Sequence, residues 1–143
     1  MKVDQQEKVR HFLEQQRFAV LSTVTPEYAS ESAVVAFSKG EGFQLVFDTL
    51  PAFRKYKNLK NNPLVSVVIG SEPMSVQYEG VAVELMGEER EKARTVHFGR
   101  FPEAKKFEEQ GLVFFKIVPK WLRYTDVSRQ PWERLEIAFP FQE

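Results

Sequence analysis

Residues 43–69 constrain the fold more than any other part of the chain; they read FQLVFDTLPAFRKYKNLKNNPLVSVVI. The two apolar ends predict strands, and the basic stretch between them predicts a short helix. That helix is expected to stop before Pro63, because the residue that precedes a proline is biased away from helical geometry. Arg54 and Lys55 then stand in its first turn, where the helix dipole disfavours positive charge. Such a pair is expected around an anion that also meets exposed backbone N–H groups, as in a phosphate site.

The entry to this helix follows from the same segment. Asp48 or Thr49 is expected to act as the N-cap, since short polar side chains accept hydrogen bonds from the first helical N–H groups. Pro51 suits the first helical turn, where the missing proline N–H costs little. The alternative interpretation of Arg54 and Lys55 is that they are solvated helix residues, as most Lys and Arg side chains are.

The rest of the chain predicts short strands with a few helices around them. A helix is expected over residues 4–16, and the charged segment 88–107 is expected to form two short helices broken near Gly99 and Pro102. Gly80, in the middle of an alternating strand, predicts a bulge or a close backbone approach. The predicted strands cover residues 18–25, 30–37, 43–47, 64–69, 74–86, 112–118, 122–125 and 135–139. This pattern indicates one domain over residues 1–143, a closed or partly closed antiparallel barrel with flanking helices.

Composition excludes several classes of function. The chain has 143 residues, 43% hydrophobic and 28% charged, which is typical of a single globular domain. Lys plus Arg and Asp plus Glu number 20 each, so no basic face for nucleic acid is expected. The absence of cysteine removes disulfides, thiolate catalysis and cysteine-ligated metals, and no metal site is predicted. The polar N-terminus lacks the apolar core of a signal peptide, and no apolar run could cross a membrane, so a cytoplasmic protein is expected.

The segment FDTLPAFRKYKNLKNNPLVSVVI, followed by VQYEGVAVEL and HFGRFPEA, resembles the pyridoxamine 5'-phosphate oxidase-like family of FMN-binding split barrels. The resemblance extends over roughly residues 18–125. It implies a mainly β, antiparallel split barrel that forms a homodimer, with one FMN in each of two clefts at the interface. It also implies a flavin-dependent oxidoreductase that acts on a small molecule, although the residues identify neither a substrate nor a catalytic side chain.

The resemblance assigns roles to particular positions. Arg54 and Lys55 match the pair that contacts the FMN phosphate, with a planar guanidinium fork beside a mobile ammonium. Asp48 and Thr49 match strand-end positions near the phosphate and the ribityl chain, although a carboxylate there is mildly repulsive.

Other positions are implied to contact the flavin ring or to close the cleft. The strand whose backbone lies along the isoalloxazine edge is matched by Ser32, Ala33, Val34 and Val35. The partner chain is expected to close the cleft with Ser75 or Gln77 and with Trp132.

Departures from the family pattern restrict the reaction. Members that oxidise pyridoxine phosphate carry Arg at the start and Lys at the end of the flavin strand, where this chain has Ser32 and Phe37. They also carry an Arg-x-His near the C-terminus, whereas the histidines here are His11 and His97. Oxidation of pyridoxine phosphate is therefore not expected.

Two alternatives to an enzyme stay open at this point. The barrel could bind flavin or haem without turnover, as a carrier or a stress-linked sensor, or it could be a dimeric interaction module that has lost its ligand. The sequence also leaves open whether deazaflavin replaces FMN. His97 could ligate haem iron or transfer protons. The other interpretation of His97 is a surface residue on a charged helix.

Overall fold

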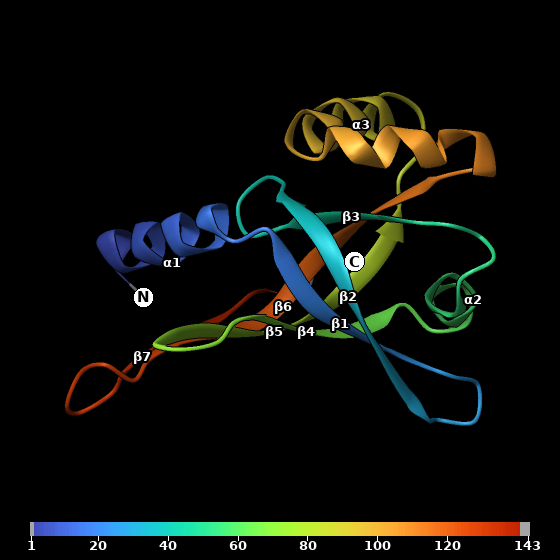
Figure 1. Cartoon of the computed structure of the whole chain (residues 1–143). Coiled ribbons are helices and arrows are strands. Elements are labelled where there is room, and N and C mark those ends of the chain that lie inside the picture. The colour runs from blue at the N-terminus through green and yellow to red at the C-terminus, as the bar shows by residue number, and fades with distance from the viewer. Residues whose placement is uncertain (1, 141–143) are drawn as a thin grey trace.

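The computed structural model describes residues 2–140, which form a mainly β structure with helices on its outside (Figure 1). In chain order the elements are α1 (Val3–Gln15), β1 (Phe18–Val24), β2 (Ser30–Lys39), β3 (Leu45–Thr49), α2 (Arg54–Asn61), β4 (Leu64–Gly70), β5 (Met74–Glu84), α3 (Gly87–Arg100), the 3-10 helix η1 (Pro102–Gln110), β6 (Val113–Asp126) and β7 (Glu133–Ala138). Among residues 2–140, no helix is long and apolar enough to span a membrane.

The sheet closes on itself as a six-stranded barrel. Its strands follow the order β3-β2-β1-β4-β5-β6-β7, every neighbouring pair is antiparallel, and an additional pairing between β3 and β6 joins the two sides. Strand β7 continues outward from β6 beyond the closed part. The predicted antiparallel split barrel is thus confirmed.

Along one edge, strand β6 pairs first with β3 and then with β7. Its first part pairs with β3 as far as Ile117, and its second part pairs with β7 from Trp121 onward. The prediction of two separate strands around Pro119 is wrong, because β6 runs through that residue. Pro119 lies opposite Gly80 where the register with β5 shifts, so the missing proline N–H falls at an irregularity in the ladder.

Gly80 is required at this bulge. A Cβ atom on Gly80 would lie 2.5 Å from the carbonyl oxygen of Val118, closer than real carbon–oxygen contacts. The bulge or close backbone approach predicted at this glycine is confirmed, and both occur together.

The barrel interior is built from aromatic side chains. Phe47 and Phe115 stack with their ring centroids 5.5 Å apart. The Tyr78 hydroxyl donates to the carbonyl oxygens of Phe43 at 2.8 Å and Ile117 at 3.1 Å, so its polar end is satisfied within the core. Burial raises the pKa of the Tyr78 phenol, which keeps it a neutral donor.

Helix α1 contributes to this core from the β7 side of the barrel (Figure 1). Its buried face consists of Val9, Phe12 and Leu13, at the spacing expected of an amphipathic helix. The Phe12 ring meets the ring of Tyr124 edge-on, with centroids 5.6 Å apart. The predicted helix over residues 4–16 is therefore present and begins one residue earlier.

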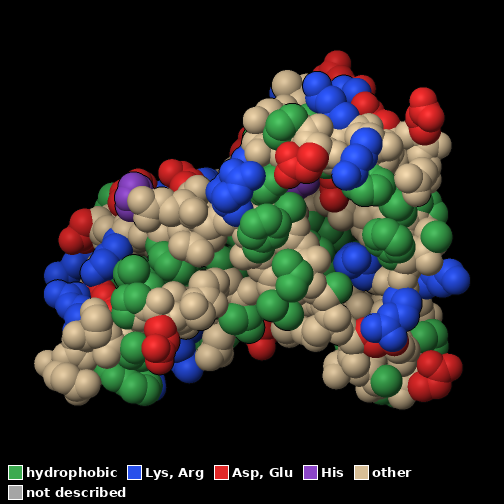
Figure 2. All heavy atoms as spheres, in the orientation of Figure 1, with side chains coloured by type: hydrophobic (Ala, Val, Ile, Leu, Met, Phe, Trp, Pro, Cys, Tyr) green, Lys and Arg blue, Asp and Glu red, His purple; other side chains and the backbone are tan. Residues whose placement is uncertain are grey.

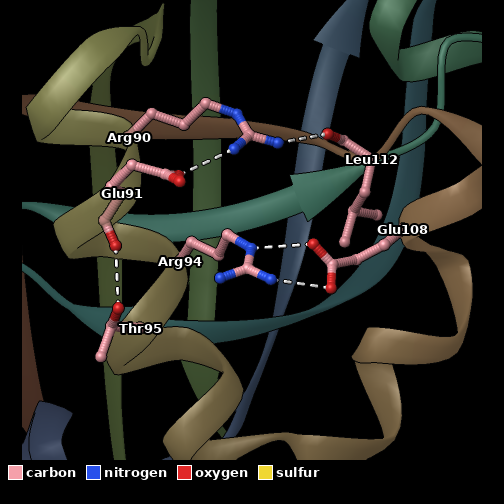
Figure 3. Close-up of polar contacts among 6 residues, drawn as sticks. All are labelled: Arg90, Glu91, Arg94, Thr95, Glu108 and Leu112. Carbon is pink, nitrogen blue, oxygen red and sulfur yellow. Dashed lines mark hydrogen bonds and ion pairs between the residues drawn. The ribbon is translucent and has the colours of Figure 1, made fainter.

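Helices α3 and η1 cover the outside of β3 and β6 over a second, smaller core. Arg94 of α3 makes two hydrogen bonds, 2.8 and 2.9 Å long, to the carboxylate of Glu108 in η1 (Figure 3). Arg90 donates to the carbonyl oxygen of Leu112 at 3.1 Å. The break near Pro102 is confirmed, but α3 has 14 residues and passes through Gly99, so it is longer than predicted.

The segment between β3 and α2 differs from its prediction. Asp48 and Thr49 do not cap the helix; they remain in β3, opposite Phe114 and Val113 of β6. Helix α2 begins only at Arg54. Pairing with β6 satisfies the backbone of residues 48–49, and this long-range pairing replaces the local cap that the sequence suggested.

Candidate functional site

A cavity of about 360 Å³ lies between strands β1 and β2 and the beginning of α2. Figure 2 shows Lys and Arg side chains gathered on the α2 side of the molecule, and α2 itself carries four cations and no acidic residue. The residues that line the cavity are Leu21, Thr23, Glu31, Ser32, Ala33, Ala52, Phe53, Arg54 and Lys55. Four of the predicted site residues are thus brought together: Ser32, Ala33, Arg54 and Lys55.

The N-terminal end of α2 borders this cavity. The N-cap is Phe53, whose side chain makes no capping hydrogen bond, and the first turn contains no acid. The first N–H groups of a helix have no acceptor within the helix. Arg54 and Lys55 occupy the first two helical positions, so their N–H groups and their cationic side chains belong to one locus that favours an anion.

Lys55 is half-buried at this locus. Loss of water lowers the pKa of its ammonium below the ordinary value, and the nearby carboxylate of Asp48 offsets part of that effect. Its Nζ atom lies 5.0 Å from the ring centroid of Phe53. A partly dehydrated ammonium gains from an anionic partner, since such a partner restores the stabilisation lost from water.

Arg54 is instead paired across the cavity. Its Nη1 atom lies 2.8 Å from Oε2 of Glu31. The other oxygen of Glu31 accepts a 2.8 Å hydrogen bond from Nδ2 of Asn58, which also donates to Oγ1 of Thr23 at 2.9 Å. This network connects β1, β2 and α2 on the wall of the cavity.

Sequence reasoning missed Thr23, Glu31 and Asn58. One signal could have found Asn58, because it stands four residues after Arg54 and therefore on the same face of the helix. Glu31 and Thr23 are cross-strand partners in the β1–β2 ladder. Their closeness to α2 depends on the register of that ladder, which the local pattern does not show.

The other residues predicted along β2 divide between the two faces of the strand. Oγ of Ser32 lies 2.7 Å from Oγ of Ser22, whereas Val34 is exposed and Val35 is buried in the core. Val34 and Val35 do not line the cavity. Their proposed role toward the flavin through backbone groups stays a prediction.

Asp48 and Thr49 lie beside the cavity wall without lining it. Oδ2 of Asp48 is 3.4 Å from Nε2 of His97, and within residues 2–140 neither atom has a hydrogen-bond partner. The Thr49 hydroxyl is likewise buried and unsatisfied. The charge of Asp48 acts on Lys55, and the contacts predicted for Asp48 and Thr49 with the cofactor stay predictions.

His97 lies on the inner face of α3 and is completely buried. Its Nδ1 atom lies 2.8 Å from Oγ of Ser38, and its ring packs against Phe101 and Phe114 at centroid distances of 5.1 and 5.9 Å. The interpretation of His97 as a surface residue is therefore wrong, because α3 packs that side of the helix onto β2 and β3. A haem iron could bind this imidazole only if α3 separated from β2 and β3, because the ring is packed between them.

The residues predicted to come from a partner chain lie elsewhere. Ser75 and Gln77 stand on β5 opposite Thr125 and Arg123 of β6, and Trp132 precedes β7 with half of its surface exposed. None of them lines the cavity of their own chain. A contribution to the cavity of a second copy stays a prediction.

Comparison with known proteins identifies the family. The family model described as pyridoxamine 5'-phosphate oxidase matches residues 5–126, most of the chain. The protein belongs to this family. The contacts expected of Arg54 and Lys55 with the FMN phosphate stay predictions. A search of curated proteins finds no match.

Solved structures with this fold bear different names. A heme binding protein from Mycobacterium smegmatis has a TM-score of 0.81 at 20% identity, and the match covers 96% of this chain but 59% of that one. General Stress Protein 26 from Bacillus anthracis str. Sterne has a TM-score of 0.70 at 26% identity, over 94% of this chain and 100% of that one.

A third solved structure is described as a pyridoxamine 5'-phosphate oxidase-related, FMN binding protein from Nostoc punctiforme. Its TM-score is 0.70 at 12% identity, over 94% of this chain and 95% of that one. The fold is thus shared by proteins named for FMN and for haem. The residues around the cavity, rather than the fold, must distinguish between these ligands.

Proposed function

We propose that the protein binds FMN, with the flavin phosphate at Arg54 and Lys55, and acts as a flavin-dependent oxidoreductase on a small molecule yet to be identified. One observation carries the proposal. A half-buried Lys55, whose pKa is lowered by burial, lies beside Arg54 at an acid-free helix start that borders a cavity. This arrangement favours the binding of an anion.

The donors around the cavity fit a flavin phosphate. Guanidinium, ammonium and helix N–H groups are the groups that proteins use for phosphate oxygens, and the cavity volume lies within the range of about 300–1,000 Å³ found for small-molecule sites. The strand backbone at Ser32 and Ala33 offers amide groups for the edge of a ring. Bound FMN would supply hydride and electron transfer, while this chain holds the phosphate and orients the ring.

A homodimer would complete the site. Val20 of β1 lies opposite Val34 of β2 and Val68 of β4, which makes a row of apolar side chains on the outer face of the barrel. These side chains are 40%, 67% and 47% exposed. Contiguous exposed apolar residues mark interaction surfaces. We propose that a second copy covers this row and brings Ser75, Gln77 and Trp132 to the cleft.

The dimer is tested by Val34→Glu, which places a charge at the most exposed residue of the row. Sedimentation should show a dimer for the natural protein and a monomer with weakened FMN binding for the variant. Val96→Glu is the matched control, because Val96 is 58% exposed on α3, outside the row. A natural protein that sediments as a monomer would exclude this assembly.

The cofactor is tested by the absorbance spectrum of the freshly purified protein and by titration with FMN. Flavin absorbance bands are expected, and Arg54→Ala combined with Lys55→Ala should abolish them. Lys57→Ala is the control, since this exposed cation of the same helix does not line the cavity. A colourless protein that takes up no FMN would refute the proposal, and a Soret band would indicate haem instead.

Turnover is a separate question from binding. The FMN-loaded protein should oxidise a reduced nicotinamide in the presence of a suitable acceptor, which is measured as loss of nicotinamide absorbance. Tight FMN binding without turnover over a panel of donors and acceptors would favour a flavin carrier or sensor over an enzyme.

A further inference from the structure

Glu31 is the one acidic side chain among the residues that line the cavity, and it faces the cations expected to hold a phosphate. Both of its oxygens are engaged, one by Arg54 and the other by Asn58, each at 2.8 Å. A carboxylate in direct contact with a phosphate-binding arginine opposes the binding of a phosphate, because both anions require the same guanidinium and repel each other.

The two partners in this ion pair differ in freedom. The Arg54 side chain is 74% exposed and the Glu31 side chain 23%. Glu31 is further held by Asn58, which is only 5% exposed and is itself bonded to Thr23, 2% exposed. Arg54 is therefore the group that can move, while Glu31 is fixed to the wall by a buried network.

We propose that Glu31 is a positioning residue that competes with the ligand phosphate for Arg54 and so sets the affinity of the site. The inference rests on the proposed function of the cavity as a phosphate site. In the ligand-free state Glu31 holds Arg54 across the cavity, and binding transfers the guanidinium from the carboxylate to the phosphate. The competition lowers the affinity for a ligand that ends in a phosphomonoester, which carries about −1.5 to −2 charges at neutral pH. It does not change the affinity for a ligand whose corresponding end is uncharged.

The test compares two flavins that differ only in the phosphate. FMN and riboflavin are titrated, with flavin fluorescence as the readout, into the natural protein and into Glu31→Gln. The variant should bind FMN about three- to tenfold more tightly, the size expected for removing one partly exposed like charge, and riboflavin with unchanged affinity. The fold should survive, because the Gln carbonyl can still accept from Asn58.

A matched control and an opposite outcome make the test decisive. Glu109→Gln removes the same charge from an exposed position on η1 and should leave both affinities unchanged. Weaker FMN binding in Glu31→Gln would show that the carboxylate supports Arg54 in its binding position. That result, or an unchanged FMN affinity, would overturn the proposal.

A second readout separates this inference from the choice of cofactor. Inorganic phosphate is titrated into both forms, and the backbone amide signals of Arg54 and Lys55 are followed by NMR. If FMN binds neither form but phosphate shifts these signals at lower concentration in Glu31→Gln, the competition stands and the flavin proposal fails. If neither FMN nor phosphate binds to either form, both proposals fail.

Discussion

Helices α2 and α3 both carry several cations, but the partners of these cations differ. On α3, Arg94 is bound by both oxygens of Glu108 and Arg90 donates to a backbone carbonyl. On α2, Lys55 is half-buried, and within residues 2–140 no carboxylate forms an ion pair with it. Arg90 and Arg94 of α3 are satisfied by the fold itself. On α2, Arg54 is paired with Glu31 and Lys60 with Glu84, whereas Lys55 is left for a ligand.

The largest effect that separates the two helices is expected in cofactor binding. Arg54→Ala combined with Lys55→Ala should weaken FMN binding by roughly 10²- to 10⁴-fold, because each hydrogen bond to a charged group contributes about 1.5–3 kcal/mol. Isothermal titration measures the change. Arg90→Ala with Arg94→Ala removes the same two charges from α3 and should leave FMN affinity unaltered. Equal losses in the two double variants would remove the distinction between the helices.

The second-largest effect is expected on the stability of the protein, when a buried residue of α3 is replaced. His97→Ala should lower the free energy of unfolding by about 2–4 kcal/mol, since it leaves a cavity and an unpaired Ser38 hydroxyl. Urea denaturation measures this loss. His11→Ala, at an exposed position of α1, is the control and should change stability little. FMN affinity of the folded His97→Ala protein should be retained; its loss would mean that His97 acts on the site.

A smaller effect is expected when stability and FMN affinity are measured against pH. The pKa of Lys55 in the folded protein is lowered from 10.5 by burial. Below that lowered pKa, the charge of Lys55 therefore lowers the free energy of unfolding. This destabilisation disappears as the pH rises toward the pKa that Lys55 has in the unfolded chain. Phosphate binding has the opposite dependence because it needs the ammonium, so FMN affinity should fall as the pH rises through the lowered pKa.

Lys55→Arg sharpens this prediction, because a guanidinium stays charged throughout that range. The variant should keep its FMN affinity at alkaline pH, whereas the natural protein loses several-fold. The measurement is FMN affinity against pH, with riboflavin titrated in parallel to remove changes that do not involve the phosphate. A parallel decline for FMN in both proteins would assign the pH dependence to another group.

The smallest effect is expected for Arg94→Ala on α3. The ion pair with Glu108 is partly exposed, so its contribution should be small and should fade with added salt. Thermal unfolding at low and high ionic strength measures this. A large loss that salt does not change would indicate that the two hydrogen bonds, rather than the charges, hold η1 against α3.

Much of the architecture could be predicted from local pattern. The strands, α1 and the bulge at Gly80 follow from two-residue alternation, helical spacing and the freedom of glycine. The predictions failed where a distant segment decided the outcome. Pairing with β6 kept residues 48–49 in a strand, and Gly80 on the neighbouring strand allowed β6 to continue through Pro119.

The residues of the candidate site likewise divide into those that local sequence predicts and those that distant segments bring together. Arg54 and Lys55 were recognisable because two adjacent cations at a helix start are locally unfavourable. His97 was misread, because a charged helix with one buried face resembles a solvated helix until its packing is known. Thr23 and Glu31 could not be found, since they belong to two strands whose closeness to α2 depends on tertiary structure, whereas Asn58 lies one helical turn after Arg54.

Local sequence therefore specifies the strand–helix–strand order and places Arg54 and Lys55 near the start of α2, because hydrophobic periodicity and the effect of a proline act over a few residues. Only the folded barrel decides what these cations face. Strand register brings Thr23 and Glu31 to the wall opposite Arg54, and the covering of β3 by α3 turns Asp48 away from the cavity toward His97. Those relations depend on long-range pairing, which short-range patterns do not encode.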